Sequence, residues 1–198
     1  MQILSRAKSA LARFRRDQEG VASVEALLLL PLLMWAYVAT FVFFDAYRTQ
    51  TDGLRVNYAI SAAIAREDEQ ELNQQYLDNM LKLASFMTRS PQALTQRVTI
   101  VCFSEKKQKY RVAWSRSTGP KKNTYKKHTH SSIDKMREQL PDMPYGDQVI
   151  VVETFMDYRP LWDVGLDTRQ FDYFSVIRPR FTNQIKWEGK PNWMCKGG

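Results

Sequence analysis

One uncharged stretch restricts the folds open to this chain more than any other feature. From Ala26 to Phe44, 19 consecutive residues carry no charge. As a helix this stretch would be about 28 Å long, which nearly matches the roughly 30 Å hydrocarbon core of a bilayer. Pro31 lies within it, but membrane helices tolerate proline because neighbouring groups satisfy the freed carbonyl. The stretch therefore predicts a membrane-spanning helix.

The residues around the stretch predict its orientation. Residues 1–16 carry five basic side chains and no acidic one. Because basic flanks stay in the cytoplasm, we expect the N-terminus on the cytoplasmic side of a bacterial inner membrane and the bulk of the chain in the periplasm. A secretory signal peptide is disfavoured, because bulky Tyr37 and Phe44 stand where cleavage after Ala39 or Ala46 needs a small residue.

Glu25 stands at the mouth of the stretch and has two interpretations. The first is local: Ser23 would cap a helix, and an acid in the first turn suits the helix dipole. The second rests on spacing, because Glu25 is the fifth residue after Gly20, which itself follows the basic leader. A carboxylate at the edge of a span usually has a partner or a function.

The block from Gly20 to Pro31 resembles the TadE-like family of the tight-adherence (Tad) pilus system. Members of that family combine a glycine, small residues, a glutamate, a leucine run and a Leu-Pro pair. The resemblance covers about residues 14–48. Segments 158–161 and 178–180 are also similar to parts of the family.

The resemblance implies a minor pilin or pseudopilin with a class III signal peptide. A prepilin peptidase would cut between Gly20 and Val21, and the new amine at Val21 would pair with Glu25 of a neighbouring subunit during assembly. Implied partners are that peptidase, other pilins of the system and the inner-membrane assembly platform. Major pilins carry an aromatic residue after the glutamate, where this chain has Ala26, so a major subunit is not implied.

The expected fold class is α+β, with a pilin-like order of three segments. These are a leader of residues 1–20 that is cleaved, a transmembrane and stem helix over 21–66, and a periplasmic domain of helices and an antiparallel sheet over 67–198. Apolar residues at helical spacing support the stem; they are Tyr47, Leu54, Tyr58, Ala62 and Ala65. The alternative is two helices broken near Gly53.

Periodicity predicts the later elements. We expect an amphipathic helix from Leu72 to before Ser90, and then a short helix over 132–140 capped by Ser131 or Ser132. Alternation of β-branched residues predicts strands; they cover 97–103, 110–114, 147–158 and 171–180. The first two form a hairpin, and the aromatic tail with Trp187 and Trp193 is expected to dock on the domain.

Segment 115–129 concentrates basic residues in a chain of net charge +8. It is either a solvated, mobile loop or an anion-binding patch for DNA or polysaccharide. The candidate binding residues are Lys121, Lys122, Lys126 and Lys127. Tyr125 is the one aromatic residue among them, which argues against nucleic acid as a partner. His128 and His130 lack a nearby acid or cysteine, so we expect no metal and no cofactor.

The two cysteines, Cys102 and Cys195, form a disulfide if the domain is periplasmic, or remain separate thiols otherwise. The bridge would close a loop of about 93 residues, worth roughly 4–5 kcal/mol in the chain-entropy model.

The sequence shows no phosphate loop, nucleophile elbow or metal-ligand motif, so we do not expect an enzyme. The leading expectation is a pseudopilin that takes part in assembling an adhesive Tad-type pilus, with its own entry into the filament left open. The alternatives are a binding module that takes anionic ligands through the basic segment, and a single-pass periplasmic protein without a pilus role.

Overall fold

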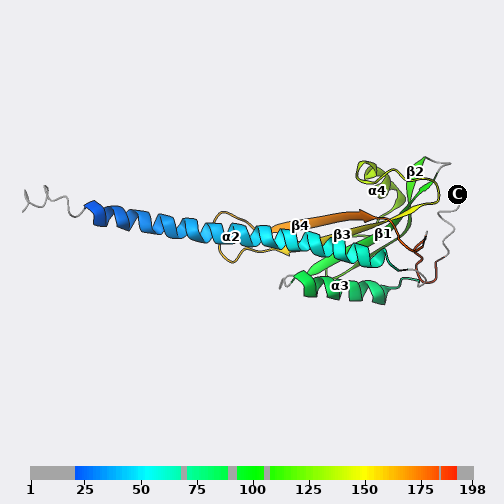
Figure 1. Cartoon of the computed structure of the whole chain (residues 1–198), viewed down its shortest axis with the longest axis horizontal. Coiled ribbons are helices and arrows are strands. Elements are labelled where there is room, and N and C mark those ends of the chain that lie inside the picture. Colours follow the sequence, from blue (N-terminus) through cyan, green and yellow to red (C-terminus); the bar gives the residue numbers. More distant parts are fainter. Residues whose placement is uncertain (1–20, 68–70, 89–92, 105–107, 183, 191–198) are drawn as a thin grey trace, which may run out of the picture. The chain divides into compact units, whose positions relative to one another are not determined.

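The computed structural model describes residues 21–67, 71–88, 93–104, 108–182 and 184–190. The chain forms two compact units. One contains the chain up to Phe44 together with Leu161–Leu166, and the other contains Asp45–Pro160 and residues 167–198. Figure 1 labels the helices and strands along the chain. The predicted leader over 1–20 lies outside the described residues.

The first described element is one continuous helix, α2, from Val21 to Ile64. It passes through Pro31 and Gly53 without a break, so the predicted long helix is confirmed and the alternative of two helices is wrong. Ser23 lies inside α2 and is therefore not the predicted cap.

Gly53 is required by packing rather than by a bend. A Cβ atom at this position would lie 2.2 Å from Cζ of Tyr173, far inside van der Waals contact. The Tyr173 ring is buried, and its hydroxyl donates to the Thr49 carbonyl at 3.5 Å. Absence of a side chain at residue 53 therefore lets α2 approach β4 closely.

Four antiparallel strands form one sheet in the order β2-β1-β3-β4. Register places Ile100 opposite both Trp114 and Ile150, and a bulge follows between Ile100 and Val101. The α+β class with an antiparallel sheet is confirmed. The strands are β1 Leu94–Ser104, β2 Lys109–Thr118, β3 Gln148–Tyr158 and β4 Arg169–Ile177.

Helices α2 and α3 bury apolar side chains against one face of the sheet. Helix α3 runs from Gln74 to Thr88 and buries Leu77 and Ala84. These join Ile60, Ile64 and Val98 in the larger core cluster. Both faces of the sheet therefore carry buried apolar side chains, because the opposite face is covered as well.

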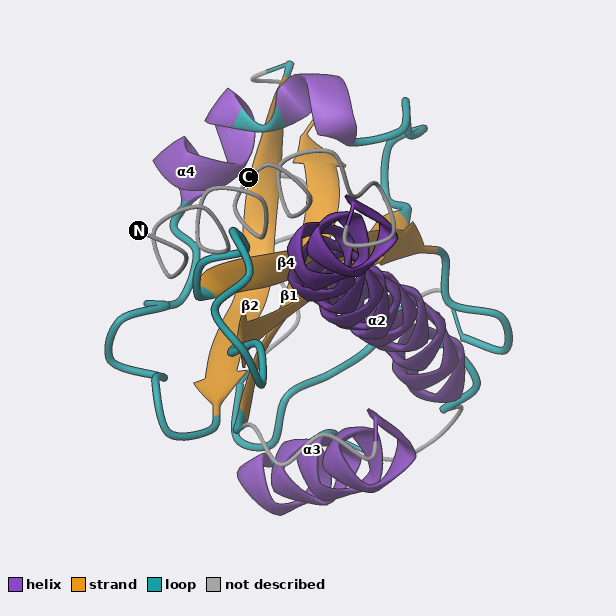
Figure 2. Ribbon diagram, turned by 90° about the vertical axis from the view of Figure 1, so that its left-hand side faces the viewer, coloured by secondary structure: helices purple, strands orange, loops and turns teal. Residues whose placement is uncertain are grey.

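The opposite face carries the short helix α4, His130–Lys135. Figures 1 and 2 show α3 and α4 on opposite sides of the sheet. Ile133 of α4 packs with Val101 and Val151 in the second cluster. The expectation of a single helix over 132–140 was wrong: a separate 3₁₀ turn, η1 Arg137–Gln139, follows α4.

Thr129 caps α4, rather than Ser131 or Ser132. The Thr129 hydroxyl accepts a hydrogen bond from the Ser132 amide at 3.4 Å, and Ser132 Oγ accepts one from the Thr129 amide at 2.9 Å. This reciprocal pair is a capping box with serine at the third helical position.

The residues whose helical spacing predicted the stem do not all lie on its buried face. Tyr47, Leu54 and Tyr58 are exposed, whereas Val56, Asn57, Ile60, Ser61 and Ile64 are buried. Strand β2 also extends to Thr118, so residues 115–118 are not part of a loop.

The segment after β4 closes the larger core. The Leu72 amide donates to the Lys186 carbonyl, and the Glu188 amide donates to the Leu72 carbonyl, both at 2.9 Å. The Trp114 indole donates to the Ile185 carbonyl at 3.0 Å, and its ring lies 4.9 Å from that of Trp187. The predicted docking of Trp187 is confirmed, whereas Trp193 lies outside the described residues.

Candidate functional site

The first candidate site is the apolar part of α2. Its large apolar side chains from Leu27 to Phe44, which are mainly leucine and aromatic residues, are mostly exposed. By length and composition α2 is able to cross a membrane, and it is the one such helix in the described part of the chain. Exposed apolar area of this extent is unusual for a helix in water and marks a surface that contacts lipid or another protein.

Glu25 lies on α2 and is exposed. It is the last charged residue before the uncharged stretch. Val21 is the first described residue of α2, and Gly20 lies outside the described residues. Cleavage between Gly20 and Val21, and pairing of Glu25 with a neighbouring subunit, stay predictions.

The second candidate site is residues 119–129, here called the basic loop. It packs on the sheet through Tyr125, whose ring stacks on that of Phe155 at 3.7 Å and an interplanar angle of 2°. The Tyr125 hydroxyl donates to the Gln170 side chain, and its carbonyl accepts from Ser117 Oγ at 2.6 Å. Tyr125 therefore fixes the loop on the sheet, and its ring is engaged by Phe155 within the chain.

The four predicted anion-binding lysines are not equivalent. Lys121 forms an ion pair with Asp157, and its hydrogen bond to that carboxylate raises the pKa of the Lys121 ammonium. Lys122, Lys126 and Lys127 are exposed. Three of the four candidates thus remain open to a ligand, while Lys121 is engaged within the chain.

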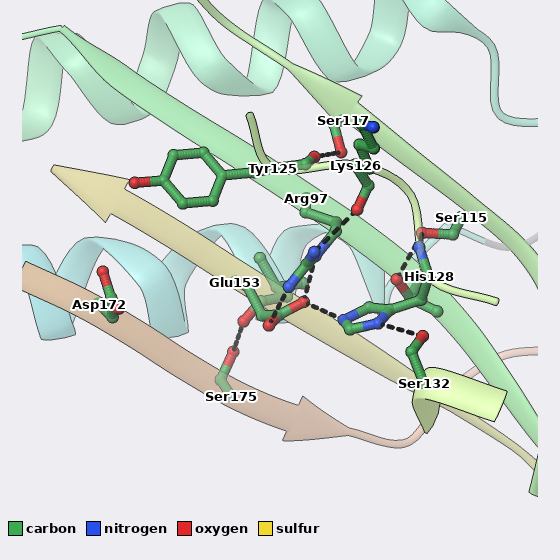
Figure 3. Close-up of polar contacts among 12 residues, drawn as sticks. Arg97, Ser115, Ser117, Tyr125, Lys126, His128, Ser132, Glu153, Asp172 and Ser175 are labelled. Carbon is green, nitrogen blue, oxygen red and sulfur yellow. Dashed lines mark hydrogen bonds and ion pairs between the residues drawn. The ribbon is translucent and has the colours of Figure 1, made fainter. Parts of the chain in front are cut away.

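A buried ion cluster secures the far end of the basic loop (Figure 3). Arg97 of β1 donates two hydrogen bonds of 2.6 Å to the Glu153 carboxylate on β3, and a third of 2.8 Å to the Lys126 carbonyl. His128 Nε2 lies 2.8 Å from Glu153 Oε2. The side chains of Arg97, His128 and Glu153 are 14%, 7% and 8% exposed.

The cluster keeps Glu153 ionised inside the protein. Burial by itself raises the pKa of the Glu153 carboxyl. Hydrogen bonds from His128 and Arg97, together with the Arg97 charge, outweigh burial and hold this pKa below its ordinary value. A buried carboxylate that accepts a bidentate arginine is tolerated because its oxygens are satisfied.

Ser132, His128 and Glu153 follow the hydrogen-bond order of a catalytic triad, since His128 Nδ1 lies 2.9 Å from Ser132 Oγ. Their surroundings assign a different role. Ser132 Oγ also accepts from the Thr129 amide as part of the cap of α4, and Arg97 already neutralises Glu153. We interpret the three side chains as a link between β3, the basic loop and α4.

The two histidines do not converge on a common point. His130 Nδ1 accepts a hydrogen bond from the Val112 amide at 3.1 Å, while both ring nitrogens of His128 bond to other side chains. Among the described residues no group of three or more His, Cys, Asp or Glu side chains is placed to hold a metal ion.

Cys102 is buried in β1 and takes part in a disulfide. This confirms that Cys102 is not a separate thiol. Cys195, its predicted partner, lies outside the described residues, so the pairing itself stays a prediction.

Sequence reasoning missed Arg97 and Glu153. The available signal was a basic residue in β1 and an acidic residue in the middle of β3, and the two strands pair so that these residues face each other. Recognising the pair would have required the register between β1 and β3, which are far apart in sequence. Comparison with protein-family models, curated proteins and solved structures finds no match to this chain.

Proposed function

We propose that this chain is a membrane-anchored minor pilin or pseudopilin that takes part in assembling a Tad-type pilus. The observation that carries the proposal is α2: a continuous helix from Val21 to Ile64 whose uncharged first part exposes its apolar side chains directly after Glu25. A helix of this kind is suited both to a bilayer and to a bundle of like helices. The resemblance of the block around Gly20 to TadE-like proteins supports the same role.

The exposed stripe on the later part of α2 adds support. Tyr47, Leu54 and Tyr58 are exposed and recur at helical spacing. An exposed aromatic stripe on a helix that already packs on a sheet with its other face is suited to a protein partner. In the proposed role that partner is another subunit of the assembly.

N-terminal sequencing of the membrane fraction tests the proposal. We expect the mature chain to begin at Val21 in cells with a prepilin peptidase and to retain its leader in cells without one. Gly20→Phe should block processing, which is visible as an unshifted band on a gel. A wild-type chain that keeps Met1 in peptidase-positive cells would refute the proposal.

The role of Glu25 needs a separate experiment. Glu25→Ala should leave processing intact but reduce pilus number on the cell surface, because a new amine at Val21 would lose its partner in an apolar environment. Glu25→Asp, which keeps the charge, serves as the matched variant and should retain part of the assembly. Normal piliation of the Glu25→Ala strain would contradict the assigned role.

Anion binding by the basic loop is the second candidate, and the exposure of Lys122, Lys126 and Lys127 favours it. The double variant Lys126→Glu and Lys127→Glu separates the two functions. If assembly is the function, pilus number stays unchanged. If the loop binds DNA or polysaccharide, retention of that polymer falls while the pilus still forms.

A further inference from the structure

The connection between β3 and β4 carries two large exposed apolar side chains. Leu161 is 72% exposed and Trp162 is 53% exposed. Both belong to the segment Leu161–Leu166, which forms one compact unit with the apolar part of α2 rather than with the sheet that it connects. Within this unit the Trp162 ring lies 6.3 Å from that of Phe41, at an interplanar angle of 59°.

The position of Phe41 sets the depth of Trp162. The uncharged stretch ends at Phe44, and Asp45 is the first charge after it. Phe41 lies four residues before Asp45, which is about 6 Å along a helix. If Asp45 marks the edge of the hydrocarbon, Trp162 lies at the boundary between headgroups and acyl chains, where tryptophan is enriched.

The charged residues around Leu161 and Trp162 agree with a position at the boundary between headgroups and acyl chains. Arg159 precedes the pair and Asp163 follows it, and both are exposed. Two bulky apolar side chains between charged neighbours are able to enter the interface while the charges remain in water. A tryptophan is well suited to this position because its ring is apolar and its N–H is polar.

We propose that Leu161 and Trp162 insert into the outer interface of the bilayer that holds α2, so that the β3–β4 connection is a second membrane contact. This inference rests on the membrane anchoring in the proposed function. It goes beyond that function because it assigns lipid contact to residues more than a hundred positions from the span. The ligand that we assign to these two side chains is the lipid surface, not a second copy of the chain.

Depth-dependent quenching of tryptophan fluorescence tests the inference on the full chain in phosphatidylcholine vesicles. Bromine atoms are placed on the acyl chains either near the headgroup or near the chain end. Trp35 lies at the middle of the uncharged stretch and is the internal control. Three variants are compared: Trp35→Phe, Trp162→Phe and the double variant, which supplies the background of the remaining tryptophans.

We expect the shallow bromolipid to remove more emission from Trp35→Phe than from the double variant, because Trp162 contacts the interface. The deep bromolipid should quench Trp162→Phe more strongly than the shallow one, because Trp35 lies at the bilayer centre. Unchanged near-ultraviolet circular dichroism, which reports the buried Trp114–Trp187 pair, verifies that the variants remain folded.

The possible failures are distinguishable. Suppose that bromolipid quenches Trp35 in the Trp162→Phe variant, but the shallow bromolipid removes no more emission from Trp35→Phe than from the double variant. Then α2 is in the membrane and the second contact is refuted. If Trp162 instead changes emission with the protein-to-lipid ratio and ignores bromine, a second copy covers it and the inference is also refuted. If Trp35 itself is not quenched, the anchoring fails and the inference fails with it.

Discussion

The Glu153 carboxylate organises the sheet face that α4 and the basic loop cover. It receives three hydrogen bonds from side chains of two other elements, Arg97 on β1 and His128 at the end of the loop. The Arg97 guanidinium extends the link to the loop backbone through the Lys126 carbonyl. Loss of one charge in such a buried group leaves the other without compensation.

Glu153→Gln should therefore destabilise the fold by about 3–5 kcal/mol, since it leaves Arg97 buried without its anion. The measurement is the free energy of unfolding in urea, with the full chain in detergent. Asp147→Asn is the matched control, because its ion pair with Arg178 is solvent-exposed with a 3.9 Å separation. That control should cost about 0–1 kcal/mol, and an equal cost for both variants would contradict the assignment.

The same carboxylate predicts a pH dependence. Its pKa in the folded chain is below the ordinary value of 4.5, so the unfolded chain binds this proton more readily than the folded chain does. The contribution of Glu153 to stability is therefore complete above about pH 4.5 and is lost as the pH falls through the folded-state pKa. The stability difference between wild type and Glu153→Gln should shrink on acidification, and a constant difference would refute this.

Gly53 supports a prediction of opposite sign to helix propensity. Alanine is favoured over glycine in a helix by about 1 kcal/mol, yet Gly53→Ala should destabilise by about 1–3 kcal/mol because the new methyl group meets the Tyr173 ring. Thermal unfolding measures the effect. In a Tyr173→Leu background the same substitution should become neutral or stabilising, and a persisting cost would show that the ring is not responsible.

At the scale of elements, the basic loop is an ordered extension of the sheet rather than a free connector. Tyr125 anchors its middle on Phe155, and the buried ion cluster anchors its end. Its exposed lysines are therefore presented from a fixed backbone. The order of this loop depends on a few specific contacts, so a single substitution should be enough to loosen it.

Tyr125→Ala should open the loop to trypsin at its lysines. Loss of an aromatic stack worth about 0.5–1.5 kcal/mol raises the open population roughly 2- to 13-fold, and cleavage should accelerate by the same factor. The rate of cleavage after Lys126 and Lys127, followed by mass spectrometry, is the measurement. Tyr47→Ala, at an exposed tyrosine of α2, is the control. Equal rates for both variants would mean that the stack does not hold the loop.

The strands and the long helix were predictable because their patterns are local. Alternating β-branched residues marked β1 and β3, and the uncharged stretch with the helical spacing that follows it marked α2. The buried face of the stem was not predictable, because Asn57 and Ser61 occupy it. Their polar groups are satisfied by Ser175 and Thr154 of the sheet, which hydrophobic periodicity does not reveal.

The candidate site was predictable only in part, for the same physical reason. Lys122, Lys126 and Lys127 are exposed, as a run of basic residues in a polar segment suggests. The pairing of Lys121 with Asp157 and of His128 with Glu153 joins positions that are 36 and 25 residues apart. Contacts of this kind depend on tertiary structure and have no signature in a single sequence.

At the scale of the whole molecule, distant parts of the chain share one core. Ile60 and Ile64 of α2, Leu77 of α3 and Trp187 after β4 belong to the same cluster. Cys102 adds a covalent link from β1, and its predicted partner Cys195 stands near the end of the sequence. Trp187 joins the segment after β4 to the sheet by packing, and the predicted disulfide to Cys195 would add a covalent link.

Reduction of the disulfide should lower the free energy of unfolding by about 4–5 kcal/mol, given a closed loop of about 93 residues. Urea unfolding with and without dithiothreitol measures the loss, and peptide mapping of the unreduced protein identifies the cysteine paired with Cys102. Cys195→Ser should behave like the reduced wild type and be indifferent to dithiothreitol. A Cys195→Ser variant as stable as the oxidised wild type would refute the predicted bridge.

Closure of the core by Ile185 and Trp187 has a consequence for biosynthesis. The Trp114 indole, Leu72 and the α3 side of the sheet make these contacts only once residues 185–188, which follow all four strands, have been synthesised. A nascent chain halted before residue 185 would expose this apolar surface and be a substrate for chaperones and proteases. Emergence of residues 185–187 from the ribosome, rather than early hairpin formation, would then set the moment at which this core becomes resistant to degradation.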